Sequence, residues 1–212
     1  MKTIILSIAL FITALGSNAN DARYIETMTR SIEVVYKSQA PEEIQQAINA
    51  LDRVGDAEKT KWEPYYYASF GYLMMATREK DAVKKDAYLD QATAEINKAA
   101  ALLPNDSEIV TMEGFIYMIR TSVDPAARGQ KFSGLAMQSY NKAIALNSEN
   151  PRAYGMLAQM QFGMARFFNS ETTEACATTR KSLEKFGSYK SENPLAPVWG
   201  RGVTEELLKQ CK

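Results

Sequence analysis

The chain has 212 residues, of which 46% are hydrophobic and 24% are charged, proportions that are ordinary for a globular protein with a full apolar core. Its 25 Lys and Arg residues are balanced by 25 Asp and Glu residues, so neither a basic surface for nucleic acid nor an acidic tail is indicated. The sequence has no histidine, which removes the commonest general base and metal ligand, so we expect no enzyme, no bound metal and no cofactor.

The N-terminus has the pattern of a secretory signal peptide. Lys2 precedes an apolar run at residues 4–15, and the small residues Ser17 and Ala19 follow it. This run is too short to span a bilayer, which needs roughly 20 apolar residues. We therefore expect a signal peptide at residues 1–19, cleavage after Ala19, no membrane insertion afterwards, and a periplasmic or secreted protein.

Helical periodicity dominates after the signal peptide, and strand-like alternation is scarce. Two helices are predicted first, at residues 21–38 and 41–53, and they form a degenerate N-terminal pair within residues 20–63. Pro41 and the acidic residues behind it suit the first turn of the second helix. The Val-Gly-Asp sequence at residues 54–56 is expected to end that helix.

The middle of the chain repeats itself. The segments INKAAALLPND (96–106) and YNKAIALNSEN (140–150) lie 44 residues apart and share five of eleven positions. A helix that opens on a large residue follows each, at Val110 and Tyr154, and an earlier copy opens at Tyr67. These spacings predict three repeated helix pairs, at residues 64–105, 106–150 and 151–190.

The repeat resembles the tetratricopeptide repeat (TPR) in its two helix patterns, large-x-x-Leu-Gly-x-x-Tyr and then Ala-x-x-x-aromatic-x-x-Ala-x-x-Leu-x-Pro. Gly71, Gly114 and Ala158 are the small residues that let a partner helix approach closely, and Pro104 stands at the closing proline. The resemblance implies an all-α fold: a right-handed superhelical stack of antiparallel helix pairs, an α-solenoid with about four pairs and a C-terminal helix.

Two features depart from the family pattern. The period is about 44 residues rather than about 34, and the additional residues fall between the two helices of a pair, at 77–90 and 121–134. The first stretch can simply lengthen its helices, whereas the second contains Asp-Pro and two glycines and is expected to be a loop with broken helix ends. Glu113 and Gln161 also stand where the pattern has Leu and Tyr.

The C-terminal part follows the repeats. A helix is expected at residues 171–186, and SENPLAPVWGRG (191–202) is held extended by its prolines. A short helix at 203–211 closes the chain, so that residues 191–212 form a C-terminal strap and helix. End units that deviate from a repeat are expected, because one of their sides faces water.

Cys176 and Cys211 are the two cysteines of the chain. In an oxidising compartment they are expected to form a disulfide that ties the last helix to the preceding one. Two free thiols are the alternative.

In TPR folds the first helices of successive pairs line a concave surface, and counting from the opening residues predicts which side chains face it. The predicted set combines aromatic residues, Met and a few charges, which is typical of a surface that binds a peptide or a helix. The set is Tyr65, Tyr72, Met75, Glu108, Phe115, Met118, Arg152, Gln159, Phe162 and Arg166. The resulting hypothesis is an exported, non-enzymatic scaffold for a protein or peptide partner.

Three alternatives stay open. The PLAPVWG segment, with Trp199, could fill the groove from within, and the protein could instead bind a small hydrophobic ligand in a cavity under this strap. An enzyme that works with carboxylates alone would need two acids that converge with shifted pKa values.

Overall fold

The computed structural model describes residues 21–211, so the expected signal peptide lies outside the described residues. A first helix covers residues 21–37. The helices that follow are α2 (Pro41–Glu58), α3 (Glu63–Arg78), α4 (Ala82–Leu102), α5 (Ser107–Thr121), α6 (Pro125–Leu146), α7 (Pro151–Phe168), α8 (Thr173–Ser188) and α9 (Arg201–Leu208).

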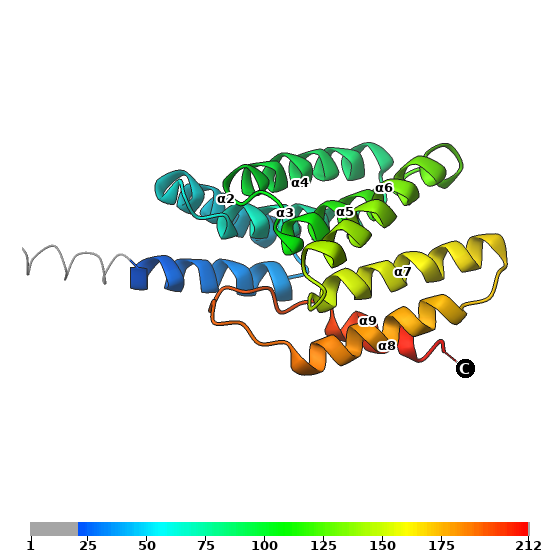
Figure 1. Ribbon diagram of the computed structural model, residues 1–212. Coiled ribbons are helices and arrows are strands. Elements are labelled where there is room, and N and C mark those ends of the chain that lie inside the picture. The colour runs from blue at the N-terminus through cyan, green and yellow to red at the C-terminus, as the bar shows by residue number, and fades with distance from the viewer. Residues whose placement is uncertain (1–20, 212) are drawn as a thin grey trace, which may run out of the picture.

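The helices stack as successive antiparallel pairs. α3 packs along α4, α5 along α6 and α7 along α8, and each pair also contacts the next through α4 and α5 and through α6 and α7. α3, α5 and α7 touch one another in turn and form an inner row, with α4 and α6 on the outer side (Figure 1). The predicted all-α, solenoid-like fold is confirmed.

Helix starts follow from capping residues that the sequence supplies. The Asp106 Oδ1 accepts hydrogen bonds from the backbone N–H groups of Glu108, at 2.8 Å, and Ile109, at 3.1 Å. Such a cap satisfies amide groups that have no partner inside the helix. Side-chain caps also begin three more helices, at Asn150 with two backbone N–H groups and at Asp81 and Asp124 with one each.

The expectation of a loop at residues 121–134 is wrong, because α6 begins at Pro125 and runs through the whole glycine-containing stretch. The Asp124 side chain caps this helix, and proline is well suited to the first helical position, where its missing N–H costs nothing. Gly129 and Gly134 face open space, so they weaken the helix without ending it.

The expected helix end at residues 54–56 is also wrong, because α2 continues to Glu58. Gly55 lies inside this helix against the ring of Tyr65, where an added Cβ would approach the Cε1 atom to 2.7 Å. At this position the glycine allows close packing of α3 on α2 and does not break the helix.

Close packing within a pair also depends on glycine. A Cβ atom added to Gly114 on α5 would lie 2.5 Å from the Cε1 atom of the buried Tyr140 on α6. The predicted role of this small residue, close approach of the partner helix, is therefore realised between α5 and α6.

The main apolar core runs without interruption from the first helix to α7. A second cluster lies between α7, α8 and α9 and contains Phe162, Cys176 and Leu207. Within residues 21–211, no helix is both long enough and apolar enough to cross a membrane.

Candidate binding site on the inner helices

An irregular segment crosses the inner row of helices. After α8 the chain makes a long irregular excursion before it returns to α9 (Figure 1), and its hydrogen bonds reach side chains of α3. We call residues 189–200 the strap. Leu195 and Pro197 are its buried residues, and the side chain of Leu195 is only 3% exposed. The strap therefore covers part of the inner helices, where the sequence analysis predicts a binding groove.

Trp199 is the aromatic anchor of the strap. Its ring stacks on Phe70 of α3 at a centroid distance of 5.4 Å and lies tilted against Phe115 of α5 at 5.8 Å. Its Nε1–H donates a hydrogen bond of 2.9 Å to the Tyr66 hydroxyl. We call Tyr66, Phe70 and Phe115 the aromatic platform, because together they support one flat ring by its face and by its polar edge.

Two further hydrogen bonds hold the strap, and both partners are side chains of α3. The Tyr67 hydroxyl donates to the backbone carbonyl of Leu195 at 2.6 Å, and the Asn193 Nδ2 donates to the buried Glu63 carboxylate at 3.1 Å. The strap is thus attached to the inner face by a few specific contacts.

A buried ion pair lies next to the platform. Arg152, at the start of α7, donates from Nε and Nη2 to the two oxygens of Glu108 on α5, at 2.7 and 2.6 Å. The guanidinium is fully buried, and the ring of Tyr189 from the strap covers it at 4.5 Å. The Arg152 Nη1 is buried and has no hydrogen-bond partner among the described residues. The pair therefore keeps one unused donor.

Burial and pairing act in opposite directions on these two charges. Burial raises the pKa of Glu108, and the hydrogen bonds from Arg152 oppose this shift. Burial disfavours the charge of Arg152, but the bonds to Glu108 outweigh it and raise the arginine pKa. Arg152 consequently stays a cation.

The structure brings three of the predicted groove residues together under the strap: Glu108, Phe115 and Arg152. Gln159 lies half-buried on α7. Arg166 is exposed near the C-terminal end of α7, where its Nη2 lies 3.4 Å from the Gln210 side chain. These last two make no contact with the strap among the described interactions.

The other five predicted residues contact neighbouring helices instead of the strap. Met118 accepts from the Tyr140 hydroxyl on α6, and Phe162 belongs to the cluster around the disulfide. Tyr65 and Tyr72 face α2, through Gly55 and Gln45 respectively, and Met75 lines a pocket together with Ile44 of α2.

The reason for this misplacement is the helical register on α3. The face that meets the strap carries Tyr66, Tyr67 and Phe70, whereas the prediction used positions one residue away from Tyr66 and two from Phe70. Nearly the whole first half of α3 is buried, so the sequence offers no polar side from which to fix the register. The aromatic density of WEPYYY and the strap's Trp199 were the available signals for the missed residues.

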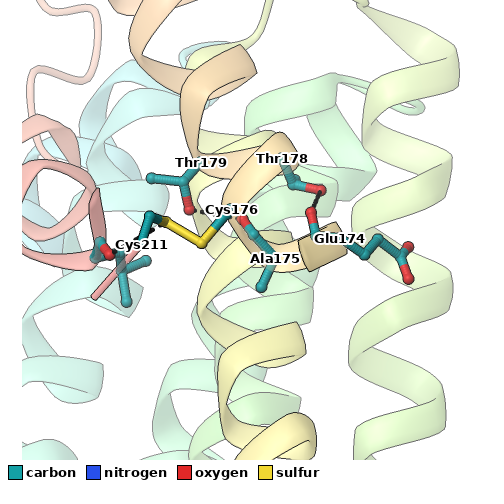
Figure 2. Close-up of a disulfide and its surroundings, with 7 residues drawn as sticks. Glu174, Ala175, Cys176, Thr178, Thr179 and Cys211 are labelled. Carbon is teal, nitrogen blue, oxygen red and sulfur yellow. Dashed lines mark hydrogen bonds between the residues drawn. A yellow bond between two sulfur atoms is a disulfide. The ribbon is translucent and has the colours of Figure 1, made fainter. Parts of the chain in front are cut away.

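A disulfide fixes the C-terminal end of the strap region. Cys176 on α8 and Cys211 after α9 are joined, with sulfur atoms 2.12 Å and Cα atoms 5.6 Å apart (Figure 2). Near Cys176, the Thr179 hydroxyl donates to the Ala175 carbonyl at 2.7 Å (Figure 2). The disulfide thus holds α9 against α8.

One pair of acids bears on the carboxylate alternative. Burial and the nearby Glu95 raise the pKa of Asp52 to about 6. Glu95 is buried on α4, and one of its oxygens pairs with Lys98 at 2.7 Å. Neither acid lines either of the two described pockets, of about 260 and 270 Å³. In the described part of the chain, no group of three or more potential metal-ligating acids or cysteines occurs.

No protein-family model matches the chain, and no curated protein matches it. Among solved structures, the HusA haemophore from Porphyromonas gingivalis superposes with a TM-score of 0.78 at 24% identity, covering 89% of this chain and 92% of that one. A thermophilic TPR protein from Thermus thermophilus gives a TM-score of 0.58 at 19% identity, with coverage of 92% and 96%. The fold is TPR-like. Both neighbours share this stack of helix pairs over about nine-tenths of the chain.

Proposed function

We propose that this chain is an exported, non-enzymatic binding protein whose inner face takes a flat, largely apolar ligand that carries carboxylates, the chemistry of haem. The observation that carries the proposal is the aromatic platform, which already holds one flat ring by stacking and by a hydrogen bond to its edge. Aromatic pairs of this kind add about 0.5–1.5 kcal/mol each beyond the area that they bury.

The charged residue beside the platform supports a ligand with acidic groups. Arg152 is a buried cation, and one of its N–H groups has no partner among the described residues. A carboxylate that reached this group would form a charge-assisted hydrogen bond, which is stronger than a bond between neutral groups. Glu108 already balances the charge, so the free donor would fix the orientation of the ligand more than it would add affinity.

The absence of histidine affects how such a ligand would be held. Without an imidazole to bind iron, the macrocycle would rely on its plane and its carboxylates, or on Tyr and Met side chains. The likeness in fold to a haemophore over nine-tenths of the chain supports the same ligand class. We therefore infer that a metal-free porphyrin would bind as well as haem.

Export is part of the proposal. The expected signal peptide and the disulfide between Cys176 and Cys211 both suit an oxidising compartment outside the cytoplasm. Mass spectrometry of the protein recovered from the producing cells would test it. A mature N-terminus at Asn20 is expected, and a retained Met1 would contradict it.

The test of ligand class is a titration of the purified protein with haem and with a metal-free porphyrin dicarboxylate, followed by absorbance and tryptophan fluorescence. Saturable binding with one site is expected for both ligands. Replacing Phe115 by Ala removes one ring of the platform and is expected to weaken binding about tenfold, equivalent to about 1.4 kcal/mol. Circular dichroism checks that the variant is folded.

Phe132→Ala is the matched control, because Phe132 on α6 stacks on Tyr117 of α5, away from the strap. Its affinity should equal that of the unmodified protein. Equal losses for Phe115→Ala and Phe132→Ala, or no saturable binding of either ligand, would contradict the proposed ligand class.

A peptide or protein partner on the inner face is the second candidate. One observation favours it: the face already holds an extended, proline-containing segment through a backbone carbonyl and an aromatic anchor, as peptide-binding grooves do. Saturable binding of a synthetic peptide with the sequence of residues 189–200 to a Trp199→Ala variant, without porphyrin binding, would favour this candidate.

A further inference from the structure

We infer that the flat ring of the ligand lies on the aromatic platform in the place that Trp199 now occupies, so that the strap and the ligand compete for one site. This inference rests on the proposed function. It adds the location of the ligand and the element that controls access to it.

The contacts of Trp199 define what the platform accepts. Two rings from successive inner helices face its indole, at interplanar angles of 25° and 32°, and a hydroxyl meets its polar edge. The two rings accept any flat aromatic body, whereas the hydrogen bond to the Tyr66 hydroxyl depends on the indole N–H and is given up when another ring replaces it. A porphyrin offers a larger flat face of the same kind, so it can replace the indole with an increase in stacked area.

We expect the strap to be able to detach from the inner helices. It has no helix, and its described side-chain hydrogen bonds to the inner face come from Glu63, Tyr66 and Tyr67, all on α3. Leu195 packs into the main apolar core and Trp199 packs against it, whereas Val198 between them is 72% exposed, so only part of the strap is buried. Long irregular segments are uncommon in compact domains, and the ordered ones usually have a function, for example as lids or binding loops.

The C-terminal end of the strap is anchored apart from the platform. Gly200, with φ of 102°, joins the strap to α9 in a conformation that other residues rarely adopt. α9 itself is held by the disulfide and by Thr204, which is buried against Gly155 on α7. The strap can therefore lift from α3 and α5 while α7, α8 and α9 stay together.

Lifting the strap uncovers the charged part of the site. Tyr189 covers the Arg152 guanidinium at 4.5 Å, and the free Nη1 lies on that same side chain. When Tyr189 moves away with the strap, the unused donor becomes accessible to a ligand carboxylate. The same movement thus exposes the aromatic platform and the Arg152 donor that would bind a ligand carboxylate.

The test compares porphyrin affinity for the unmodified protein, for Trp199→Ala and for Val198→Ala. Removing the anchor raises the fraction of molecules with an open platform, and the apparent affinity rises with that fraction. Trp199→Ala is expected to bind a metal-free porphyrin dicarboxylate about fivefold or more tightly. Val198→Ala, which changes an exposed residue of the same strap, should bind as the unmodified protein does. Equal or weaker binding by Trp199→Ala would overturn the inference.

Two further readouts complete the test. The dimethyl ester of the porphyrin lacks the free carboxylates. For this ester, most of the gain in affinity of Trp199→Ala over the unmodified protein should be absent, because Arg152 has no carboxylate to bind. A fluorescent naphthalene sulfonate dye should bind Trp199→Ala more strongly than Val198→Ala, whether or not either protein binds porphyrin. Dye binding without porphyrin binding would support the strap as a cover and overturn the ligand class. Porphyrin binding without any effect of Trp199→Ala on dye or porphyrin would overturn the competition alone.

Discussion

Arg152 carries a charge in a place where an unmatched charge would be very costly, and it is tolerated because Glu108 meets it with two parallel hydrogen bonds. Both residues could be named from the sequence as candidates for the inner face. Their pairing could not, because they are 44 positions apart and nothing local connects them. The unused N–H of Arg152 is visible only once every neighbour is placed.

The acid pair between α2 and α4 gives a prediction about pH. The pKa of Asp52 is about 6 in the folded protein, against about 3.9 in an unfolded chain, because burial and Glu95 disfavour its charge. The folded state therefore binds the Asp52 proton more tightly than the unfolded chain does. Protonation of Asp52 stabilises the fold fully below about pH 4, and this stabilisation is lost as the pH rises through about 6. Lys98 offsets part of the repulsion.

Asp52→Asn is expected to raise the free energy of unfolding at pH 8 by about 1 kcal/mol, a value reduced for the partial exposure of the side chain. At pH 5 the gain should be smaller, because much of Asp52 is then protonated. Urea unfolding at the two pH values measures both. Glu42→Gln, which changes an exposed acid on the same helix that does not act on Asp52, is the control, and an equal change in both variants would contradict the assignment.

In α6, the amino-acid composition suggests a loop where the structure has a helix. Asp-Pro and two glycines usually indicate a break, yet here the aspartate and proline start the helix and the glycines face solvent. The sequence contains the capping signal at Asp124, but it does not say on which side of the proline the helix lies. The three-dimensional packing of α6 along α5 decides this, since the helix gains more from that contact than it loses through two glycines.

The cap of α6 can be tested directly. Asp124→Ala is expected to lower the free energy of unfolding by about 1 kcal/mol, because the Ala127 backbone N–H loses its acceptor. Asp124→Asn keeps an acceptor at the same place and should change the free energy of unfolding by only a few tenths of a kcal/mol. Urea unfolding distinguishes the two. An equal loss in both variants would indicate that the charge, and not the cap, is what matters.

α3 illustrates the limit of counting along a helix. Its first ten residues after the cap are almost all buried, because α2, α4, α5 and the strap surround it. A helix that is buried on every side has no polar stripe, so periodicity identifies the helix but not which face meets which neighbour. The predicted residues on α3 were therefore displaced from the strap face to the side of α2.

The arrangement of the whole molecule was partly accessible from sequence. The repeated small and large residues indicate helix pairs that stack in order, and the TPR-like fold follows from that repetition. The path of the strap could be raised only as one alternative, because its contacts join residues 128 and 133 positions apart. Contacts between residues so far apart produce no periodic pattern in a single sequence.

The disulfide is the covalent contribution to the stability of the whole chain. The double variant Cys176→Ser with Cys211→Ser is expected to lower the free energy of unfolding by about 3–4 kcal/mol, as chain entropy predicts for a loop closed over a separation of 35 residues. Urea unfolding with and without reductant measures it. Unchanged stability of the unmodified protein on reduction would contradict this role.

Because Cys176 and Cys211 lie on either side of the strap, the strap is part of a covalently closed ring. A protease that cut the backbone after the exposed Lys190 would open the ring without releasing either piece. The C-terminal fragment would stay tethered through sulfur, and Trp199 would stay close to its partners on α3 and α5. A protein with this connectivity keeps both pieces together after a cut in the strap.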